Sequence, residues 1–291
     1  MSPRAAVFGA SGQLGVELVR ELGARGYNVA AWDRHKVDIT DQPAVENALA
    51  AAHAEIVFNS AAYNQVDGAE QEPLAALEVN ALGVRNLAMA CRQTSAHLVH
   101  FSTDYVFDGH TSRPYTEDAP PHPLSAYAVS KLAGELYAQA YLEKPLVIRT
   151  CGVFGPAGRN TPRGNFVELM LRLARAGKPI RVVEDHVVSP TFAPWLAART
   201  VDLAELHLSG VFHIGGGTPT SWFDFARMIF DAAGLRPELT RTNEREYRTA
   251  ARRPKYSALS NSKMEAAGIA PMAPIREALQ AYFAQRESLA S

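Results

Sequence analysis

Two residues spaced four apart, Tyr127 and Lys131 in SAYAVSKLAGEL, could carry out proton transfer. If this stretch is helical, both side chains lie on one face, one turn apart. A neighbouring ammonium favours the phenolate, so we expect Lys131 to lower the pKa of Tyr127 from its usual value of about 10. Tyr127 could then protonate a carbonyl oxygen near neutral pH. The same spacing also fits a surface tyrosine and lysine on an amphipathic helix.

A second group of polar residues follows an apolar run in FSTDYVFDGH. Leu98–Ser102 predicts a buried strand, and Thr103, Asp104 and Tyr105 come directly after it. The carboxyl ends of strands in a doubly wound sheet face the ligand crevice. We therefore expect Thr103 to hydrogen-bond the carbonyl oxygen that Tyr127 protonates, and Asp104 and Tyr105 to line the pocket. A solvated turn is the alternative.

A glycine-rich turn, GASGQLG, lies between the first predicted strand and a helix. Gly9 permits a tight turn, Gly12 lets the backbone approach a pyrophosphate, and Gly15 permits close packing of helix on strand. The free N–H groups at the helix start suit an anion. An ordinary strand–helix turn has the same glycines, but the position within a βαβ unit favours dinucleotide binding.

The end of the second predicted strand bears on the choice of cofactor. Asp33 could accept a hydrogen bond from a ribose 2′-OH. Arg34 and Lys36 follow it and could instead hold a 2′-phosphate. NADH and NADPH both stay open, with NADPH favoured.

Apolar runs alternate with segments of helical periodicity, which is typical of an α/β fold with a Rossmann-type doubly wound parallel sheet. The predicted strands are Ala5–Phe8, Asn28–Ala31, Glu55–Asn59, Leu98–Ser102 and Leu146–Arg149, and the predicted helices are Gly12–Arg25, Gln42–Ala52, Leu74–Gln93 and Ala126–Tyr141.

The alternation loosens in the second half of the chain. We expect a dinucleotide-binding domain over residues 1–155 and a smaller α/β substrate-binding lobe over residues 156–291, partly interleaved with the first. A helix and a strand near residues 190–215 could return to the first domain.

Composition excludes several classes of protein. The 291 residues carry a formal net charge of −1, which argues against a nucleic-acid partner. No uninterrupted apolar stretch reaches about 18 residues, so no membrane span is expected. The N-terminus enters the first strand at once, which predicts a cytoplasmic protein. The two cysteines, Cys91 and Cys151, are expected to pack rather than to bind a metal.

Several longer motifs identify a family. The glycine turn, Tyr127 with Lys131, Asn80 and Thr103 resemble the extended short-chain dehydrogenase/reductase superfamily. More narrowly, VFNSAAYNQVDGAE, STDYVFDG, SWFDFA and RRPKYSAL resemble the dTDP-4-dehydrorhamnose reductase family over nearly the whole chain. The resemblance implies an NAD(P)H-dependent reductase of a nucleotide-linked 4-keto-6-deoxy sugar.

The resemblance also implies roles for single residues. It implies a catalytic triad of Thr103, Tyr127 and Lys131, with Lys131 also at the nicotinamide ribose. Its cofactor-binding residues are Gly9, Ser11, Gly12, Gln13 and Leu14 at the pyrophosphate, Asp38 and Ile39 at the adenine, Ala61, Ala62 and Tyr63 at the ribose, and Asn80 at the nicotinamide. Its substrate-binding candidates in the second half are Asn165, Thr191 and Arg253.

The substrate side departs from the family. RTCGVFG places Cys151 and Gly152 where the family commonly has a serine and a tryptophan, which removes a large apolar surface from the sugar side. His186 stands in place of a glutamine and is expected to be a polar contact or a loop residue. These changes favour the same reaction on a related sugar.

Two other functions stay open. A sugar-nucleotide epimerase or dehydratase shares the same core, but a dehydratase is expected to have Asp-Glu after Thr103, where this chain has Asp104 and Tyr105. A non-catalytic regulator would resemble the β subunit of methionine adenosyltransferase. A homodimer is compatible with each reading.

Overall fold

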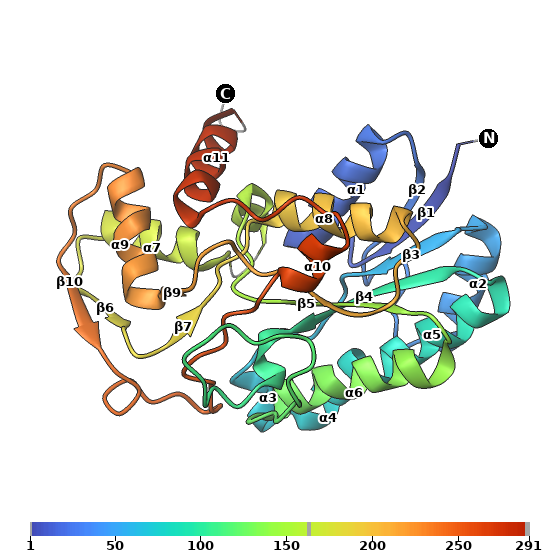
Figure 1. Ribbon diagram of the computed structural model, residues 1–291, viewed down its shortest axis with the longest axis horizontal. Coiled ribbons are helices and arrows are strands. Elements are labelled where there is room, and N and C mark those ends of the chain that lie inside the picture. The colour runs from blue at the N-terminus through green and yellow to red at the C-terminus, as the bar shows by residue number, and fades with distance from the viewer. Residues whose placement is uncertain (1, 162–163, 289–291) are drawn as a thin grey trace.

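A six-stranded parallel sheet forms the centre of the protein in the computed structural model, which describes residues 2–161 and 164–288 (Figure 1). The strand order is β2-β1-β3-β4-β5-β8, and every neighbouring pair is parallel. The predicted α/β fold with a Rossmann-type doubly wound sheet is therefore confirmed. The strands are β1 (Arg4–Phe8), β2 (Asn28–Trp32), β3 (Ile56–Asn59), β4 (His97–Thr103), β5 (Leu146–Thr150) and β8 (Gly210–His213).

Helices cover both faces of this sheet because alternate residues of a strand point to opposite sides. In β1, Ala5 and Val7 pack in one apolar core, while Ala6 and Phe8 pack in the core on the other face. The helices of the first face are α1 (Gln13–Ala24) and α8 (Ala193–Glu205), and those of the second are α2 (Gln42–Ala52), α5 (Gly83–Thr94) and α6 (Ala126–Tyr141).

The strand order reverses at β1. β2 lies on one side of β1, and β3 begins the opposite half of the sheet. Loops that leave the carboxyl ends of β1 and β3 therefore diverge and leave a crevice, which is where open α/β sheets bind ligands.

The helix predicted over Leu74–Gln93 contains a π-helical turn. α4 (Pro73–Leu77) passes into η1 (Glu78–Leu82) and then into α5. The whole run is long and apolar enough to cross a membrane by length and composition, with a mean hydropathy of 1.2. However, 56% of that window is buried inside the protein, as in a core helix. It is weak support for a membrane span.

The smaller lobe has its own apolar core, in which Phe154 packs with residues of three helices. β6 pairs in parallel with β10, and β7 pairs antiparallel with β9. Its elements are α7 (Phe166–Arg175), β6 (Ile180–Val183), β7 (Val187–Val188), β9 (Thr220–Ser221), α9 (Trp222–Ala232), β10 (Leu239–Thr242) and α11 (Ile275–Ser288). The remaining short elements are α3 (Gly68–Gln71), η2 (Asp104–Val106), η3 (Pro156–Asn160) and α10 (Ser262–Ala266).

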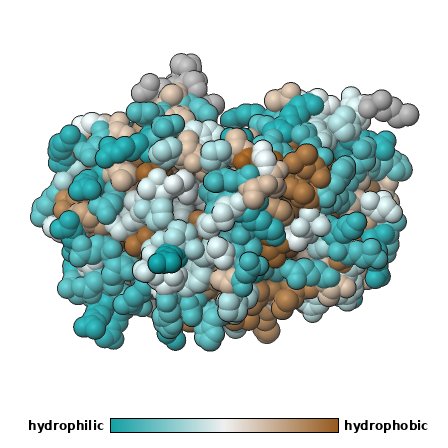
Figure 2. All heavy atoms as spheres, viewed as in Figure 1, coloured by the Kyte–Doolittle hydropathy of each residue, from teal (hydrophilic) through white to brown (hydrophobic). Residues whose placement is uncertain are grey.

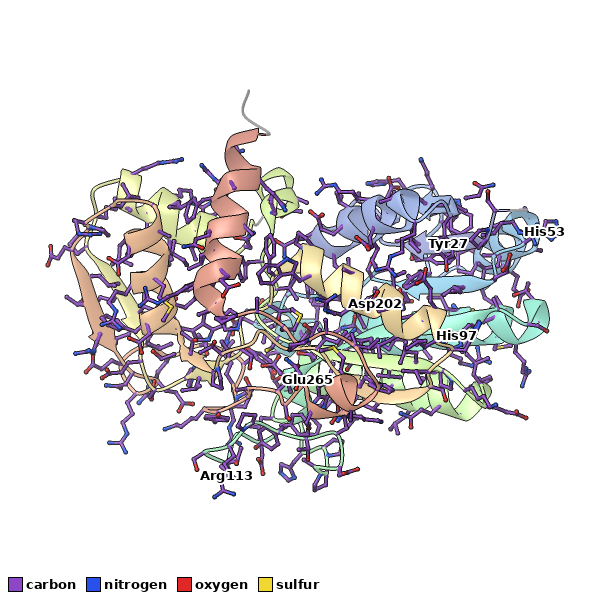
Figure 3. All side chains as sticks on the ribbon, turned by 45° about the horizontal axis from the view of Figure 1, so that its top comes forward. Tyr27, His53, His97, Arg113, Asp202 and Glu265 are labelled. Carbon is purple, nitrogen blue, oxygen red and sulfur yellow. The ribbon has the colours of Figure 1, made fainter. Side chains whose placement is uncertain are left out.

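Residues 193–213 belong to the large sheet rather than to this lobe. β8 pairs with β5, and charged contacts hold α8 on α1. Arg25, directly after α1, contacts Asp202 at 2.7 Å and Glu205 at 2.8 Å. Figure 3 shows Asp202 on α8 and Tyr27 close to the end of α1. The domain boundary predicted at residue 155 stays a prediction.

Several apolar side chains are exposed along α4, η1 and α6. Leu74, Leu82, Val129 and Leu136 are the ones among them with large exposed fractions. Figure 2 shows hydrophobic surface at the lower edge of the molecule, where α4 and α6 lie in Figure 1. Such surface is common where copies of a chain associate, and the homodimer stays a prediction.

Candidate active site

A cavity of about 370 Å³ lies at the carboxyl ends of β3, β4 and β5. Thr103, Tyr127 and Lys131 line it on the sheet side. Val188 and Trp222 line it from the smaller lobe. The cavity thus joins the two parts of the chain at the crevice that the strand order creates.

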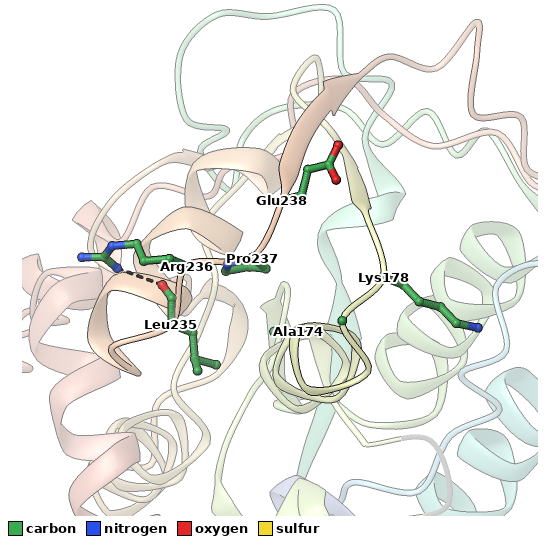
Figure 4. Close-up of a pocket in the computed structure, with 7 residues that line it drawn as sticks. Ala174, Lys178, Leu235, Arg236, Pro237 and Glu238 are labelled. Atoms are coloured by element: carbon green, nitrogen blue, oxygen red, sulfur yellow. Dashed lines mark hydrogen bonds between the residues drawn. The ribbon is translucent and has the colours of Figure 1, made fainter.

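A second hollow, of about 340 Å³, lies away from the sheet, between the end of α7 and the loop before β10. Its charged residues are Lys178, Arg236 and Glu238, and Figure 4 shows their side chains pointing away from one another. Arg236 Nη1 donates to the carbonyl of Leu235 at 2.8 Å. These groups do not converge on a common point, so the cavity at the sheet is the better candidate for chemistry.

Regular elements place the three residues predicted to be catalytic. Thr103 ends β4 and caps η2, accepting the N–H of Tyr105 at 3.2 Å. Ser125 caps α6 in the same way, so Tyr127 stands in its first turn and Lys131 one turn later. Tyr127 and Thr103 both line the cavity, where the Thr103 hydroxyl acts on the pKa of Tyr127. The end of β4 and the start of α6 therefore bring these three residues together in one cluster.

The expected direction of the Tyr127 pKa shift is wrong. Burial raises the pKa of Tyr127 to about 12; the hydrogen bond with Thr103 opposes this shift, and the charge of Asp104 adds to it. Lys131 is not among the causes of this shift, and one N–H of its Nζ donates to the carbonyl of Phe101 at 2.6 Å. Spacing along the helix places the lysine one turn from the tyrosine, and the sign of the pKa shift follows from burial.

A buried ion pair lies one helical turn beyond Lys131. Glu135, one turn further along α6, binds Arg149 of β5 at 2.7 Å, and both are almost fully buried. Ser102 also donates to Glu135. Burial lowers the pKa of Lys131 to about 8, against the opposing charge of Glu135. This pair fixes α6 to the strands that carry the site.

The glycine turn forms a backbone cradle. Gly9 has φ +75°, and a Cβ there would lie 2.6 Å from the backbone N of Ala61. A Cβ at Gly15 would lie 2.1 Å from the carbonyl oxygen of Gly9. Gly12 caps α1 without a side-chain hydrogen bond, so the first N–H groups of α1 stay available. This arrangement fits a pyrophosphate.

The other residues predicted at the pyrophosphate differ in exposure and in partners. Ser11 is exposed, while Leu14 packs partly buried against the core beneath. Gln13 lines the cavity and donates to the carbonyl of Val153 at 2.8 Å. Asn165, the N-cap of α7, donates to Gln13 Oε1 at 2.7 Å. Gln13 and Asn165 therefore tie the glycine turn to the smaller lobe.

The residues predicted at the adenine end lie around the loop after β2. Asp33 Oδ1 accepts the N–H groups of His35 and Lys36 at 2.9 and 3.1 Å. Asp38 Oδ1 is bound to Thr40 in the same manner. The side chain of Ile39 does not face solvent, because it is buried in the core under α2 and α5.

The predicted ribose and nicotinamide residues fall into two groups. Ala61 and Ala62 line the cavity, whereas Tyr63 and Asn80 are not among the residues that line it. The Asn80 amide binds both the N–H and the carbonyl of Tyr63 at 2.9 Å, and donates to Ser130 at 3.0 Å. Asn80 therefore joins the loop after β3 to α6, and its place at the nicotinamide stays a prediction.

On the substrate side, Asp104, Tyr105 and Gly152 line the cavity. Gly152 has φ +52°, and a Cβ there would lie 3.4 Å from Trp222 Cη2. The indole of Trp222 thus supplies apolar surface beside the position that lacks a tryptophan. The sequence motif SWFDFA contains Trp222. The sequence alone did not predict the contact, because Trp222 and Gly152 are far apart in the chain.

Thr191 and Arg253 do not line the cavity. Thr191 is fully buried and donates to the carbonyl of Ser189 at 2.9 Å. Arg253 pairs with Asp67 at 2.7 Å and is hydrogen-bonded to Tyr105, which does line the cavity. Arg253 is therefore one residue removed from the cavity wall, and the hydrogen bond to Arg253 lowers the pKa of Asp67.

His186 and Cys151 have no visible role in the cavity chemistry. His186 is buried beside Asp185 and Glu244, and Lys255 lies 3.9 and 3.5 Å from these two carboxylates and offsets one of their two charges. Cys151 lines the cavity, and burial raises its pKa well above the usual range, so its thiol stays protonated.

Comparison with known proteins gives one family. The family model described as "RmlD substrate binding domain" matches residues 4–288. A dTDP-4-dehydrorhamnose reductase of Streptomyces griseus is 39% identical, covering 97% of this chain and 93% of the relative. A dTDP-4-keto-6-deoxy-D-glucose reductase of Streptomyces niveus is 37% identical, covering 94% and 93%. The crystal structure of a Bacillus anthracis dTDP-4-dehydrorhamnose reductase with NADP has a TM-score of 0.93 at 34% identity, covering 98% of this chain and 100% of the other. The chain therefore belongs to the dTDP-4-dehydrorhamnose reductase family, as its motifs predict.

Proposed function

We propose that this protein reduces the 4-keto group of a nucleotide-linked 4-keto-6-deoxy sugar with NADPH or NADH. The observation that carries the proposal is the cluster of Thr103, Tyr127 and Lys131 in a cavity beside the Gly9 cradle. A dinucleotide held at the cradle and a sugar in the cavity would meet at the Tyr127 hydroxyl. The names of the relatives support the same reaction.

Tyr127 acts as the proton donor. Its raised pKa keeps the hydroxyl protonated at neutral pH, ready for the alkoxide that forms at the former carbonyl. Thr103 hydrogen-bonds the same oxygen and orients the carbonyl. Bound reduced nicotinamide supplies the hydride. Lys131, anchored on Phe101, presents its ammonium to the nicotinamide ribose.

The loop after β2 supports NADPH. Asp33 has one carboxylate oxygen committed to backbone N–H groups. Arg34 and Lys36 are exposed, and neither is in an ion pair within the described residues, so both are available for a 2′-phosphate. The Bacillus anthracis relative was solved with NADP.

The natural sugar is the open part of the proposal. Relatives of nearly equal identity carry names that specify two different 4-keto sugars. The Gly152 and Trp222 wall is the part of the cavity most suited to distinguish them, because it contacts neither the cradle nor the proton donor.

The test is a turnover assay on purified, folded protein. We expect reduced nicotinamide absorbance to fall when the two 4-keto sugars are supplied separately as dTDP conjugates, and faster with NADPH than with NADH. No oxidation with any dTDP-, GDP- or UDP-linked 4-keto sugar contradicts the proposal. Co-purification with a synthetase would then indicate a regulatory subunit, and retained NAD⁺ an epimerase. The cytoplasm stays the predicted location.

A further inference from the structure

Two acidic side chains and a histidine meet beside β7, and none of them is among the residues that line the cavity. Asp185 and His186 directly precede β7, and Glu244 lies in the loop after β10. One carboxylate oxygen each of Asp185 and Glu244 and one ring nitrogen of His186 lie within 4.8 Å of one another. Three metal-ligating side chains from two distant segments of the chain therefore converge on one point.

The imidazole of His186 is the unsatisfied member of this cluster. His186 is 6% exposed, and its buried Nε2 has no hydrogen-bond partner within residues 2–161 and 164–288. Buried polar groups normally have a partner, because a group without one loses its bond to water and gains nothing in return. Burial lowers the pKa of His186, against the charges of Asp185 and Glu244, so the ring is neutral and can offer a lone pair.

The two carboxylates are held in place and can be reached from solvent. Both oxygens of Asp185 accept the N–H of Glu244, at 3.2 and 3.3 Å, which fixes the loop after β10 beside β7. Both side chains are partly exposed. Lys255 faces them at 3.9 and 3.5 Å, but its own side chain is more than half exposed and free to turn into solvent. Arg253, the other nearby cation, is paired with Asp67.

We propose that Asp185, His186 and Glu244 bind a divalent transition-metal ion, for which zinc is the best fit; this inference goes beyond the proposed reductase function and does not depend on it. Zinc takes imidazole nitrogen and carboxylate oxygen at about 2.0–2.2 Å, which places the ligand atoms of a tetrahedral site about 3.4 Å apart. Rotation of the exposed Glu244 side chain and displacement of Lys255 complete such a site, with water as the fourth ligand. The imidazole favours zinc over Mg²⁺ and Ca²⁺, which prefer oxygen ligands.

The proposed site adjoins the lobe wall of the cavity. The carbonyl of His186 accepts the N–H of Trp222 at 3.2 Å, and Val188 lines the cavity together with Trp222. A bound ion would join the loop after β10 to this wall and stabilise the folded lobe by mass action. The family commonly has a glutamine in place of His186, so the site is expected in this chain rather than throughout the family.

The test is zinc binding by the untagged protein, measured by competition with a chromophoric chelator. We expect a single equivalent to bind and to raise the midpoint of thermal unfolding, with Mg²⁺ and Ca²⁺ at least about tenfold weaker. His186→Gln, which introduces the common family residue, should weaken zinc binding roughly tenfold or more. Glu244→Gln should weaken it similarly, and its position in an exposed loop leaves the core undisturbed.

Two further variants separate this site from the other histidines. The matched control is His110→Gln, because His110 also lies beside a carboxylate, 3.4 Å from Asp108, but is 82% exposed. It should leave the zinc affinity unchanged. Lys255→Gln removes the competing cation and should tighten zinc binding roughly tenfold. Thermal unfolding without zinc shows that each variant is folded.

Each outcome decides the inference. A folded wild-type protein that binds no zinc overturns it, and so does a His186→Gln variant with wild-type affinity. An equal loss in His110→Gln shows adventitious binding to surface histidines and overturns it as well. Weaker binding in His186→Gln and Glu244→Gln, with tighter binding in Lys255→Gln, supports the site. Turnover of 4-keto sugars is measured separately, so failure of the reductase function leaves this result unaffected.

Discussion

The two walls of the cavity are built differently. On the sheet side, Thr103, Tyr127 and Lys131 come from β4 and α6, and Thr103 and Lys131 are held by hydrogen bonds to main-chain groups. On the lobe side, Gly152 and Trp222 come from a loop and a helix start, and present a positive-φ backbone and an apolar ring. The first wall shares its elements with the core of the sheet, whereas the second can change without disturbing it.

This contrast explains where the family pattern is kept and where it departs. The groups proposed to carry out the proton transfer are fixed by β4, α6 and the buried Glu135–Arg149 pair. Gly152 and Trp222, which we propose meet the sugar, lie outside that network, so we expect replacement there to be tolerated. Variants of each wall should therefore fail in different ways.

The largest effect is expected on the sheet wall. Tyr127→Phe removes the proton donor and should lower kcat about 10³-fold, with NADPH binding unchanged. The control is Tyr105→Phe, whose ring packs edge-on at 6.1 Å from that of Tyr127 and whose hydroxyl binds Arg253. It should act mainly on KM. A Tyr127→Phe enzyme with nearly normal kcat would contradict the proposed donor.

A stability test comes next. Arg149→Met leaves Glu135 buried without its partner and should lower the free energy of unfolding by about 3–5 kcal/mol in a urea titration. The lobe offers a matched pair, Arg227 and Asp224 at 3.0 Å, which is about half exposed. Arg227→Met should change stability by less than about 0.5 kcal/mol. Equal losses of unfolding free energy in both variants would contradict the expected difference between the buried ion pair of the core and the exposed pair of the lobe.

The smallest effect is expected at the lobe wall. Gly152→Ala places a Cβ at φ +52°, beside Trp222, and should destabilise the fold by about 1 kcal/mol. It should also change KM for the sugar nucleotide while leaving kcat and KM for NADPH within about twofold. Gly177→Ala, at φ +64° with open surroundings, should lose similar stability without any change in KM. If both glycines alter KM alike, Gly152 does not contact the sugar.

Local patterns predicted much of this protein. The apolar strand over residues 98–102, the glycine turn and the start of α6 at Ala126 depend on neighbours in the chain, and each element is present with ends shifted by at most two residues. The spacing of Tyr127 and Lys131 similarly fixed their common face of α6. Family motifs supplied the residues of the sheet wall.

Contacts between distant segments decided the rest. The role of Asn80 at the nicotinamide stays a prediction, but the local sequence did not show that its amide binds Tyr63 and Ser130, 17 and 50 residues away. The sign of the Tyr127 pKa shift depended on burial, to which the charge of Asp104 adds. Trp222 reaches Gly152 only because α9 packs over the loop after β5. Sequence alone predicted which residues carry the chemistry; only the tertiary structure decided what surrounds them, because burial and hydrogen-bond partners come from segments far apart in the chain.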